Sequence, residues 1–357
     1  MSKIVVAILC GGRSSEHEIS CISAGGILGA INRDIYEPVL IGITRTAGRW
    51  VLIPESYSMG IVDGVLPTVP EDAQEISTDL HGFSVNGKAL HIDVIFPMLH
   101  GPYGEDGTIQ GFCEIANIPY VGSGVLASAV AMDKSFTKSI FEAHGMKVAQ
   151  GILITVEQWS SQRDGCEKRL SMLTYPIFVK PARGGSSRGT SKVRSRDEFD
   201  EAIAEAHRYD RKALIEEMVS GREIECAVLE MDGAVRTSQP GEVIIDSRFE
   251  FYDFEAKYLD DATDAKIPAN IPQDASAEIR RLASLAFTSL GCSGLARVDF
   301  FYQENGQIVI NEINTIPGFT PTSMFPNLWA ESGINYTQLI HELIKTALTR
   351  VNSVLGN

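Results

Sequence analysis

Apolar runs separated by glycine turns define the first elements of the chain. Residues 3–9 form a continuous run rich in β-branched residues, a glycine turn follows at residues 11–12, and a helical pattern over Ser20–Ile31 leads to a second apolar run at Val39–Ile43. A strand, a helix and a strand in this order predict a β-α-β unit with a parallel sheet.

The pattern then alternates between polar excursions and regular elements. Residues 44–90 are polar and weakly periodic, and we expect an excursion from the first domain there. The sheet resumes at Ile92–Met98, and Gly107–Asn117 predicts another helix. One long amphipathic helix is expected over Ser128–His144, ended by Gly145.

Shorter elements follow in the second half of the chain. Three strands and a helix are predicted in its middle part, at Gln150–Thr155, Ile177–Pro181, Ala213–Met218 and Arg196–Tyr209. Two helices are predicted in its last part, one over Ala275–Leu290 that stops at Gly291, and a terminal one from Tyr336.

Length and composition describe a globular protein with more than one core. The chain has 357 residues, of which 44% are apolar and 22% charged, so two or three domains are expected. Acidic residues (46) outnumber basic ones (31), for a net charge of −15. This charge argues against nucleic acid or an anionic membrane as a partner, because both require a basic face.

The location of the protein is also suggested by what the sequence lacks. No apolar run approaches the ~20 residues that span a bilayer, and residues 1–9 carry no signal-peptide pattern. The six cysteines are scattered, without the spacing of a zinc site or a disulfide framework. We expect a cytoplasmic enzyme whose cysteines are reduced and mostly buried.

Two alternating segments near the end of the chain predict a β-hairpin. Ala296–Tyr302 and Gln307–Asn314 alternate, and Asn305-Gly306 lies between them, which is a strong signal for a two-residue turn. A two-residue turn would set three pairs of opposed residues: Glu304 with Gln307, Asp299 with Glu312, and Arg297 with Asn314.

The expected pairing of Asp299 with Glu312 has a chemical consequence. Two directly opposed carboxylates repel each other, and a divalent cation between them reverses the sign of that interaction. Asp, Glu and Asn side chains are hard oxygen donors, which suit Mg²⁺ together with phosphate oxygens. The hairpin therefore suggests a divalent-cation site, with a solvated strand face of accidental charges as the alternative.

A second candidate lies in the middle of the chain, where a strand ends in Lys180 and the Gly/Ser-rich loop 182–189 follows. Glycines let backbone N–H groups approach a polyphosphate, hydroxyls donate hydrogen bonds and Lys supplies charge. A flexible surface hairpin is the alternative, since the Walker A pattern is absent. Residues 10–18 also lack the dinucleotide fingerprint. His100 opens a glycine-rich loop after an apolar strand, where parallel sheets place ligands.

Taken together, these stretches resemble the D-alanine–D-alanine ligase family of the ATP-grasp superfamily. The matching segments span nearly the whole chain in the family's order: GGRSSEHEIS (11–20), HGPYGEDG (100–107), MDK (132–134), VKPARGGSSRG (179–189), FYDFEAKY (251–258), GLARVDFF (294–301) and NEINTIPGFTPTSMFP (311–326).

The resemblance implies an α/β fold, with α+β character in the ATP-grasp part, and three domains: 1–131, 132–220 and 221–357. ATP is expected between the sheets of the last two, with two Mg²⁺ ions for which Mn²⁺ can substitute. The implied nucleotide ligands are Lys134, Lys180 and Lys257, the segment Glu216, Glu217, Met218 and Val219, and Glu223 for the ribose. The implied metal ligands are Asp299, Glu312 and Asn314, with Glu312 bridging the two ions.

The reaction implied by the resemblance joins two D-alanines through an acyl phosphate, for peptidoglycan precursors. Arg297 and the N–H of Gly318 are expected to form the oxyanion hole. The implied substrate contacts are Glu16 with the first ammonium group, His100 in the first domain's loop, and Ser323 with Lys257 at the second carboxylate. Glu16, Ser186 and Tyr258 are expected to close the site by hydrogen bonds across the domains.

Substrate choice and assembly are expected from the same resemblance. Tyr258 favours an amine over a hydroxy acid as second substrate, since relatives that make D-alanyl-D-lactate depart from this Tyr. The alternatives are D-alanyl-D-lactate or D-alanyl-D-serine synthesis on the same scaffold. Gly184 and Phe254 differ from the Glu and Tyr of many members. The family further implies a homodimer formed through the first domain.

Overall fold

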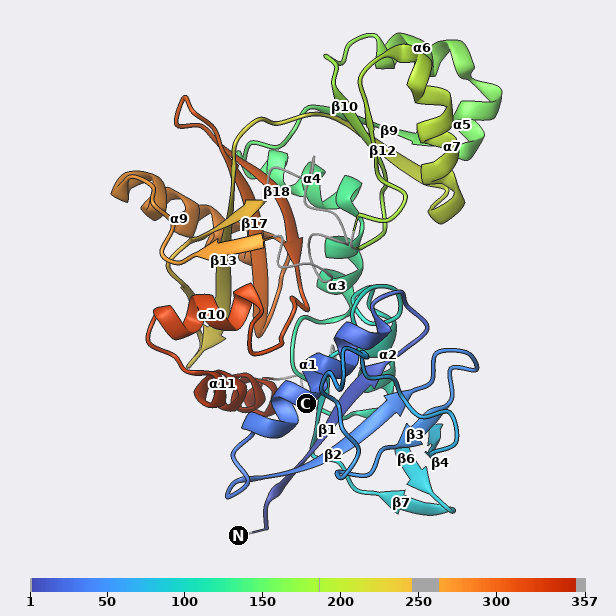
Figure 1. The fold of residues 1–357 in the computed structure, drawn as a ribbon, viewed down its shortest axis with the longest axis vertical. Coiled ribbons are helices and arrows are strands. Elements are labelled where there is room, and N and C mark those ends of the chain that lie inside the picture. Colours follow the sequence, from blue (N-terminus) through green and yellow to red (C-terminus); the bar gives the residue numbers. More distant parts are fainter. Residues whose placement is uncertain (1, 186, 246–262, 351–357) are drawn as a thin grey trace.

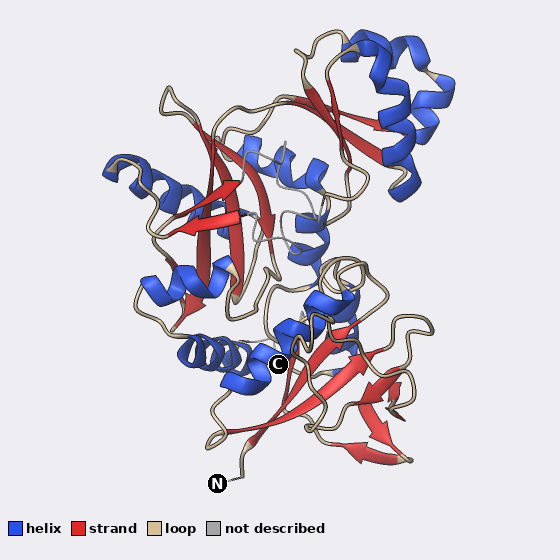
Figure 2. Cartoon of the chain, in the orientation of Figure 1, coloured by secondary structure: helices blue, strands red, loops and turns tan. Residues whose placement is uncertain are grey.

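The computed structural model describes residues 2–185, 187–245 and 263–350. Three main sheets follow one another in the chain, each with helices against it (Figures 1 and 2). A parallel sheet at the start and antiparallel sheets afterwards confirm the predicted α/β fold class with its α+β later part. Within the described residues, no helix has the length and apolar character needed to cross a membrane.

The first sheet has the strand order β4-β3-β2-β1-β8. Its three parallel strands are β1 (Ile4–Gly11), β2 (Tyr36–Ile43) and β8 (Val94–Pro97). The expected excursion supplies two antiparallel strands on one side of this sheet, β3 (Trp50–Leu52) and the edge strand β4 (Gln74–Glu75). It also forms the small antiparallel sheet β5 (Ser77–Asp79), β6 (Gly82–Val85) and β7 (Lys88–Leu90). The apolar run of β1 is buried because parallel strands are covered on both faces.

Two helices of this first part confirm their predicted positions to within three residues. They are α1 (His17–Ala30) and α2 (Thr108–Ala116). All six cysteines are free and buried, as expected.

The single helix expected over residues 128–144 is wrong. The chain forms α3 (Val125–Met132) and α4 (Lys134–Ala143), separated by Asp133. Asp133 leaves the helical conformation (φ −92°, ψ 96°), and its carboxylate accepts hydrogen bonds from the N–H groups of Ser135 and Phe136 at the start of α4. The apolar pattern continues across this break, so periodicity alone did not reveal it. Gly145, with φ +75°, ends α4 as predicted.

The central sheet is antiparallel, in the order β11-β10-β12-β9. Its strands are β9 (Gly151–Thr155), β10 (Ile177–Pro181), β11 (Ser191–Val193) and β12 (Lys212–Glu217). The helices α5 (Val156–Ser161), α6 (Arg163–Leu170) and α7 (Phe199–Tyr209), with the 3₁₀ turn η1 (Arg196–Glu198), lie together on one side of it (Figure 1). The pattern predicted α7 but missed α5 and α6.

The last sheet has the order β16-β15-β13-β17-β18, with β14 paired to β13. Its strands are β13 (Arg222–Met231), β14 (Ala234–Thr237), β15 (Gly241–Ile245), β16 (Thr263–Lys266), β17 (Leu295–Tyr302) and β18 (Ile308–Asn314). The helices here are α9 (Gln273–Ser289), α10 (Met324–Glu331) and α11 (Tyr336–Thr349), of which α10 was not predicted.

The hydrophobic cores connect these parts. Helix α9 packs on the last sheet together with Phe141 of α4, while Leu339 and Leu343 of α11 share a core with β1 of the first sheet. These shared cores hold the last sheet against both α4 and the first domain. The domain boundaries themselves remain predictions.

Candidate active site

A cavity of about 890 Å³ lies where the three main sheets approach one another. Residues from the first, central and last parts of the chain all line it. Every described residue proposed for the site is among them: Glu16, His100, Lys134, Lys180, Glu216, Glu217, Met218, Val219, Glu223, Arg297, Asp299, Glu312, Asn314, Gly318 and Ser323. Ser186, Lys257, Tyr258 and the variable Phe254 lie outside the described residues.

The hairpin of β17 and β18 has the expected pairs at its functional end, although the turn is different. Asp299 lies opposite Glu312, and Arg297 opposite Asn314. The expected pair of Glu304 with Gln307 is wrong, because Gln303 takes that place and its N–H donates to the carbonyl of Gln307 at 2.9 Å. The turn thus contains three residues, 304–306, with Gly306 at φ +81°.

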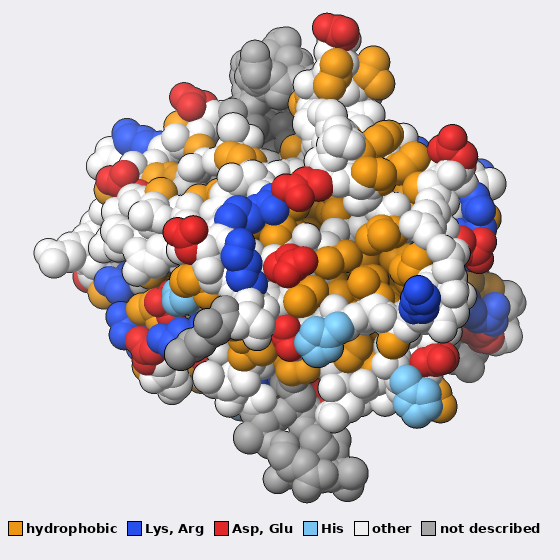
Figure 3. All heavy atoms as spheres, turned by 90° about the horizontal axis from the view of Figure 1, so that it is seen from below, with side chains coloured by type: hydrophobic (Ala, Val, Ile, Leu, Met, Phe, Trp, Pro, Cys, Tyr) orange, Lys and Arg blue, Asp and Glu red, His pale blue; other side chains and the backbone are white. Residues whose placement is uncertain are grey.

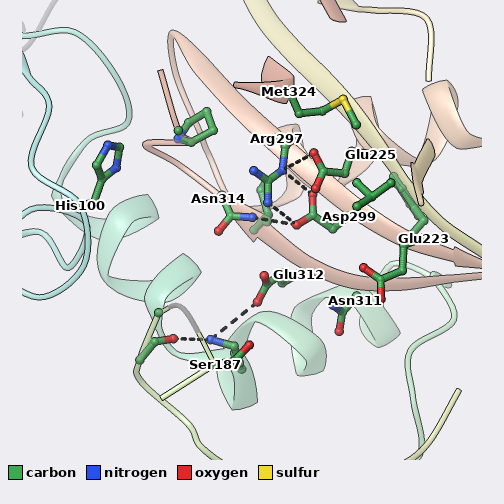
Figure 4. Close-up of a pocket in the computed structure, with 18 of the residues that line it drawn as sticks. His100, Ser187, Glu223, Glu225, Arg297, Asp299, Asn311, Glu312, Asn314 and Met324 are labelled. Carbon is green, nitrogen blue, oxygen red and sulfur yellow. Dashed lines mark hydrogen bonds and ion pairs between the residues drawn. The ribbon is translucent and has the colours of Figure 1, made fainter. Parts of the chain in front are cut away.

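A bulge corrects the register before the functional residues. Phe300 pairs with Ile310 and Asp299 with Glu312, so Asn311 has no opposite residue on β17. In a regular strand, neighbouring residues point to opposite faces, but both Asn311 and Glu312 line the cavity (Figure 4). The longer turn and the bulge shift the register in opposite directions, which leaves the two carboxylates opposed.

Arg297 organises the acidic side chains on this sheet (Figure 4). Its Nε and Nη2 each donate to a different carboxylate oxygen of Asp299 at 2.7 Å, and Nε also lies 3.0 Å from Glu225 Oε2. Nδ2 of Asn314 donates to Asp299 at 3.0 Å. Asn314 therefore has its amide oxygen left to offer to a cation.

The donor set fits Mg²⁺ by its chemistry. Asp299, Glu312 and Asn314 supply carboxylate and amide oxygens from two paired strands, and Mg²⁺ completes such sets with water and phosphate oxygens. No group of three His, Cys, Asp or Glu side chains is gathered as a metal site in the part of the chain that the structure describes. The third protein ligand would accordingly be the amide of Asn314.

Two lysines approach the cavity opposite this sheet. Nζ of Lys134, at the start of α4, donates to the carbonyl of Gly184 at 2.7 Å and lies 3.7 Å from Glu312 Oε2. Lys180, near the end of β10, forms an ion pair with Glu216 of β12. Burial tends to raise the pKa of Glu216, but Lys138 and Lys180 lower it to about 2. The carboxylate therefore stays charged.

The glycine-rich loop is anchored at its base and approaches the first domain. Arg183 donates to Asp210 from its backbone N–H at 2.9 Å and from Nε at 3.1 Å. A Cβ at Gly185 would lie 3.0 Å from Glu16 Oε2, which is a tight contact, so a side chain at this position would press on the Glu16 carboxylate. At the variable position 184, the backbone carbonyl is the group that contacts Lys134.

His100 connects the first domain to the segment that follows β18. Its Nδ1–H donates to the carbonyl of Ile316 at 3.1 Å, and Nε2 lies 3.2 Å from Ser23 Oγ. Burial lowers the pKa of His100, partly opposed by the charge of Glu16. The imidazole is therefore neutral, and its Nε2 accepts the hydrogen bond of Ser23.

Ser323 is held by a tight turn beside Gly318. The N–H of Thr320 donates to Ser323 Oγ at 3.0 Å, and a Cβ at Gly318 would lie 3.2 Å from the same oxygen. At the other end of the cavity wall, the N–H of Met218 donates to the carbonyl of Pro176 at 3.0 Å, which fixes the end of β12.

The structure adds four polar residues to the site that sequence reasoning missed: Glu105, Lys138, Glu225 and Asn311. Glu105 stands within the HGPYGEDG segment, and Asn311 next to Glu312, so their positions in the chain gave a signal. Lys138 lies one helical turn after Lys134, and Glu225 pairs with Asp299 across β13 and β17. The partners of these two residues, Glu216 for Lys138 and Asp299 for Glu225, come from other elements, so spacing in the sequence does not reveal them.

The cavity lies between two antiparallel sheets, with two lysines and a glycine-rich loop on one side and oxygen donors on the other. This arrangement is that of a ligase of the ATP-grasp class. Family models for the N-terminus and the C-terminus of D-ala D-ala ligase match residues 5–123 and 140–345. The chain belongs to the D-alanine–D-alanine ligase family.

Individual relatives support the same assignment. A D-alanine--D-alanine ligase of Pseudarthrobacter chlorophenolicus is 49% identical, with 97% of this chain and 94% of that protein covered. One of Mycobacterium leprae is 46% identical, with 98% and 94% covered. Among solved structures, the D-Ala:D-Ser ligase VanG of Enterococcus faecalis has a TM-score of 0.84 at 33% identity, with 97% of this chain and 100% of that one covered. The D-alanine-D-alanine ligase of Coxiella burnetii has a TM-score of 0.83 at 34% identity, with 98% and 94% covered.

Proposed function

We propose that this chain catalyses the reaction after which its family is named, the ATP-dependent joining of two D-alanines to D-alanyl-D-alanine for peptidoglycan synthesis. The observation that carries the proposal is the single cavity that gathers cationic, oxygen-donor and anionic groups from all three parts of the chain. Such a cavity can hold polyphosphate, a cation and an ammonium group at the same time.

The nucleotide is assigned to the side of the cavity formed by α4, β10 and β12. Lys134 and Lys180 contact its phosphates, Glu216–Val219 border the adenine, and Glu223 binds the ribose. Lys257, which lies outside the described residues, is proposed as a further nucleotide ligand. Asp299, Glu312 and Asn314 would hold two Mg²⁺ ions, or Mn²⁺ in their place. When bound, the ions offset the charge that develops on the transferred phosphoryl group.

The chemistry proceeds in two steps. The carboxylate of the first D-alanine attacks the γ-phosphorus of ATP, which gives an acyl phosphate and ADP. The amine of the second D-alanine then attacks the acyl carbon, the phosphate leaves, and the amine's proton is released. Arg297 and the N–H of Gly318 stabilise the oxyanion formed in this second step.

The two substrates are held by different parts of the chain. Glu16 binds the ammonium of the first D-alanine, beside His100 in the first domain. Ser323 with Lys257 binds the carboxylate of the second. Glu16, Ser186 and Tyr258 close the cavity across the domains. The close approach of Gly185 to Glu16 supports this closure, because it places residue 185 of the glycine-rich loop beside the first domain.

The direct test is phosphate release from ATP with D-alanine as the only amino acid. We expect release that requires both Mg²⁺ and D-alanine, with D-alanyl-D-alanine as the product, and none with L-alanine. Absence of D-alanine-dependent release from folded protein would refute the proposed function.

The second candidate is D-alanyl-D-serine or D-alanyl-D-lactate synthesis. It is favoured by the similarity to VanG, which matches as well as the D-alanine-D-alanine ligase of Coxiella burnetii. Competition between D-alanine, D-serine and D-lactate across pH separates these reactions, and we expect D-alanine to be preferred. Tyr258→Phe is expected to raise the use of D-lactate relative to D-alanine; an unchanged ratio would remove Tyr258 from substrate selection.

We also assign a homodimer formed through the first domain, in the cytoplasm. Figure 3 views the molecule from the side of this domain and shows apolar side chains gathered on its face. Leu80 and Ile115 of the first domain are exposed at 68% and 64%. Apolar side chains that are gathered on one face favour a partner surface. Light scattering of the purified protein would distinguish a dimer from a monomer.

A further inference from the structure

Glu216 is a buried carboxylate with two lysine partners. Its Oε1 lies 2.6 Å from Nζ of Lys138, and its Oε2 pairs with Lys180. The side chains of Glu216 and Lys138 are only 4% and 7% exposed. A buried carboxylate requires a counter-charge, and one cation is enough to neutralise it. Burial lowers the pKa of Lys138, and the charge of Glu216 opposes this shift. With both lysines protonated, the trio carries one surplus positive charge.

The two lysines differ in what they can reach. Lys180 lines the cavity, whereas Lys138 lies behind it and does not. Lys138 is on α4, one turn after Lys134, and its side chain turns to β12. Among the described residues, Glu216 is its one ion-pair partner. The charge of Lys138 is thus paired with Glu216 and does not face the cavity.

The position of Lys180 makes it the group able to exchange partners. Lys180 pairs with Leu214 in the sheet, so Glu216 is its diagonal neighbour on the same face of β12. Its side chain is 16% exposed, toward the cavity. With Lys138 present, Lys180 can turn to a phosphate without leaving Glu216 unpaired. Without Lys138, the same movement would leave a buried charge uncompensated.

We propose that Lys138 is a positioning residue for nucleotide binding, which neutralises Glu216 so that the charge of Lys180 is available to a phosphate. This inference rests on the proposed nucleotide site but not on the identity of the amino-acid substrates. Lys138 touches neither nucleotide nor substrate, and it acts through Glu216 alone.

The test is the affinity of the full-length protein for a non-hydrolysable ATP analogue with Mg²⁺ and, separately, for adenosine, both measured by calorimetry. Lys138→Met is expected to weaken binding of the analogue by about tenfold or more, since a buried pair would have to be broken. Binding of adenosine, which has no phosphate, should stay as in the wild type. Lys138→Arg should restore most of the affinity for the analogue.

A double variant separates charge from packing. In Lys138→Met/Glu216→Gln, the carboxylate that holds Lys180 is gone as well, so the analogue should bind more tightly than it does to Lys138→Met. Because Glu216 also borders the proposed adenine site, adenosine is measured with the same variant, and any loss that the analogue still shows should not exceed the loss for adenosine. A residue needed only for packing would give a double variant as weak as Lys138→Met, or weaker. Lys212→Met is the matched control, because Lys212 pairs with Asp133 at the start of α4 and does not line the cavity.

Three results would overturn the inference. They are wild-type affinity of Lys138→Met for the analogue, equal losses for the analogue and adenosine, and no recovery in a folded double variant. A wild-type protein that binds the analogue but releases no phosphate with D-alanine would refute the proposed function and leave this inference standing. If Lys138→Met does not fold, Lys138→Arg and the double variant still decide the matter.

Discussion

Glu105 and Glu216 line the same cavity, and burial acts on both carboxyl groups, yet their pKa values move in opposite directions. Burial raises the pKa of Glu105 to about 8, with the charge of Glu16 adding to the effect. Burial also disfavours ionisation of Glu216, but its two lysines lower the pKa to about 2. Burial by itself favours the protonated form of both carboxyl groups, and the neighbours either add to this effect, as Glu16 does, or overcome it, as the two lysines do.

The difference shows what each part of the cavity is suited to bind. Around Glu216, two lysines meet one carboxylate, so the surplus is positive and an anion such as a phosphate is favoured. Around Glu105, a second carboxylate, Glu16, meets a neutral His100, so a cation such as an ammonium group is favoured. In the proposed reaction, the ammonium group is therefore expected near Glu16 and Glu105, and the phosphates near Lys180.

The largest effect is expected at Glu312, which lies between these parts at 3.7 Å from Lys134. Glu312→Gln removes one carboxylate charge from the residues that would hold Mg²⁺ and should lower kcat by roughly 100- to 1,000-fold, the loss typical of one transition-state contact. The melting temperature should stay the same. Steady-state kinetics over a Mg²⁺ titration measures this.

The matched control is Glu304→Gln, the same change at an exposed position of the same hairpin. It should leave kcat unchanged. Near-normal turnover of Glu312→Gln at saturating Mg²⁺ would remove Glu312 from the metal site.

The next largest effect is expected at the acidic part of the cavity. Glu16→Gln should raise the KM for the first D-alanine by about 10- to 100-fold, since one charged hydrogen bond contributes roughly 1.5–3 kcal/mol. The KM for ATP should change little. Initial rates at varied D-alanine and ATP show the split. Glu18→Gln, two residues along on α1 and paired with Arg45, is the control. An equal rise in both KM values would contradict the proposed division of the cavity.

The hairpin shows which features of the site could be predicted from the sequence and which could not. Alternation and the Asn-Gly pair predicted that Asp299 opposes Glu312, and this pair is confirmed. The prediction assumed a two-residue turn, however, and the structure has a three-residue turn and a bulge at Asn311 that compensate each other. A bulge changes the direction of one side chain without disturbing the apolar pattern, so the pattern cannot reveal it.

Other misses have different physical causes. The break at Asp133 lies inside an unbroken amphipathic pattern, and its capping role depends on a local change of backbone direction. Helix α5 is short and polar, and its signal was the capping box of Thr155 and Gln158 rather than periodicity. Lys138 could not be recognised because its partner, Glu216, comes from another element and the packing of α4 against β12 brings them together.

The raised pKa of Glu105 predicts a pH dependence of stability. The folded chain holds this proton up to about pH 8, whereas the unfolded chain loses it near the ordinary value of 4.5, so stability should fall between these values as pH rises. Each ~1 kcal/mol lost lowers the Tm by about 2–4 °C in a domain of 150–250 residues. Thermal unfolding from pH 5 to pH 8 should show a fall of a few degrees in the wild type.

Glu105→Gln keeps an oxygen to accept the hydrogen bond from the N–H of Gly101, which is 2.7 Å long in the wild type. Its Tm should vary less over this pH range. An equally steep fall in the variant would mean that Glu105 ionises normally.

The smallest effect is expected on the acid side, from Glu216. A carboxylate with a depressed pKa contributes its stability above the ordinary value of 4.5 and loses it as pH falls toward about 2. Glu216→Gln alone would leave the buried Lys138 and its neighbour Lys180 without their shared partner. Lys138→Met/Glu216→Gln is the better variant, because it removes one charge of each sign. Between pH 4.5 and 2, the double variant should lose less stability than the wild type, measured by urea unfolding. Other carboxylates titrate over the same range and set a common slope, so the difference between the two curves carries the information. Parallel curves would mean that Glu216 is not held ionised by its lysines, and the contrast with Glu105 would then rest on Glu105 alone.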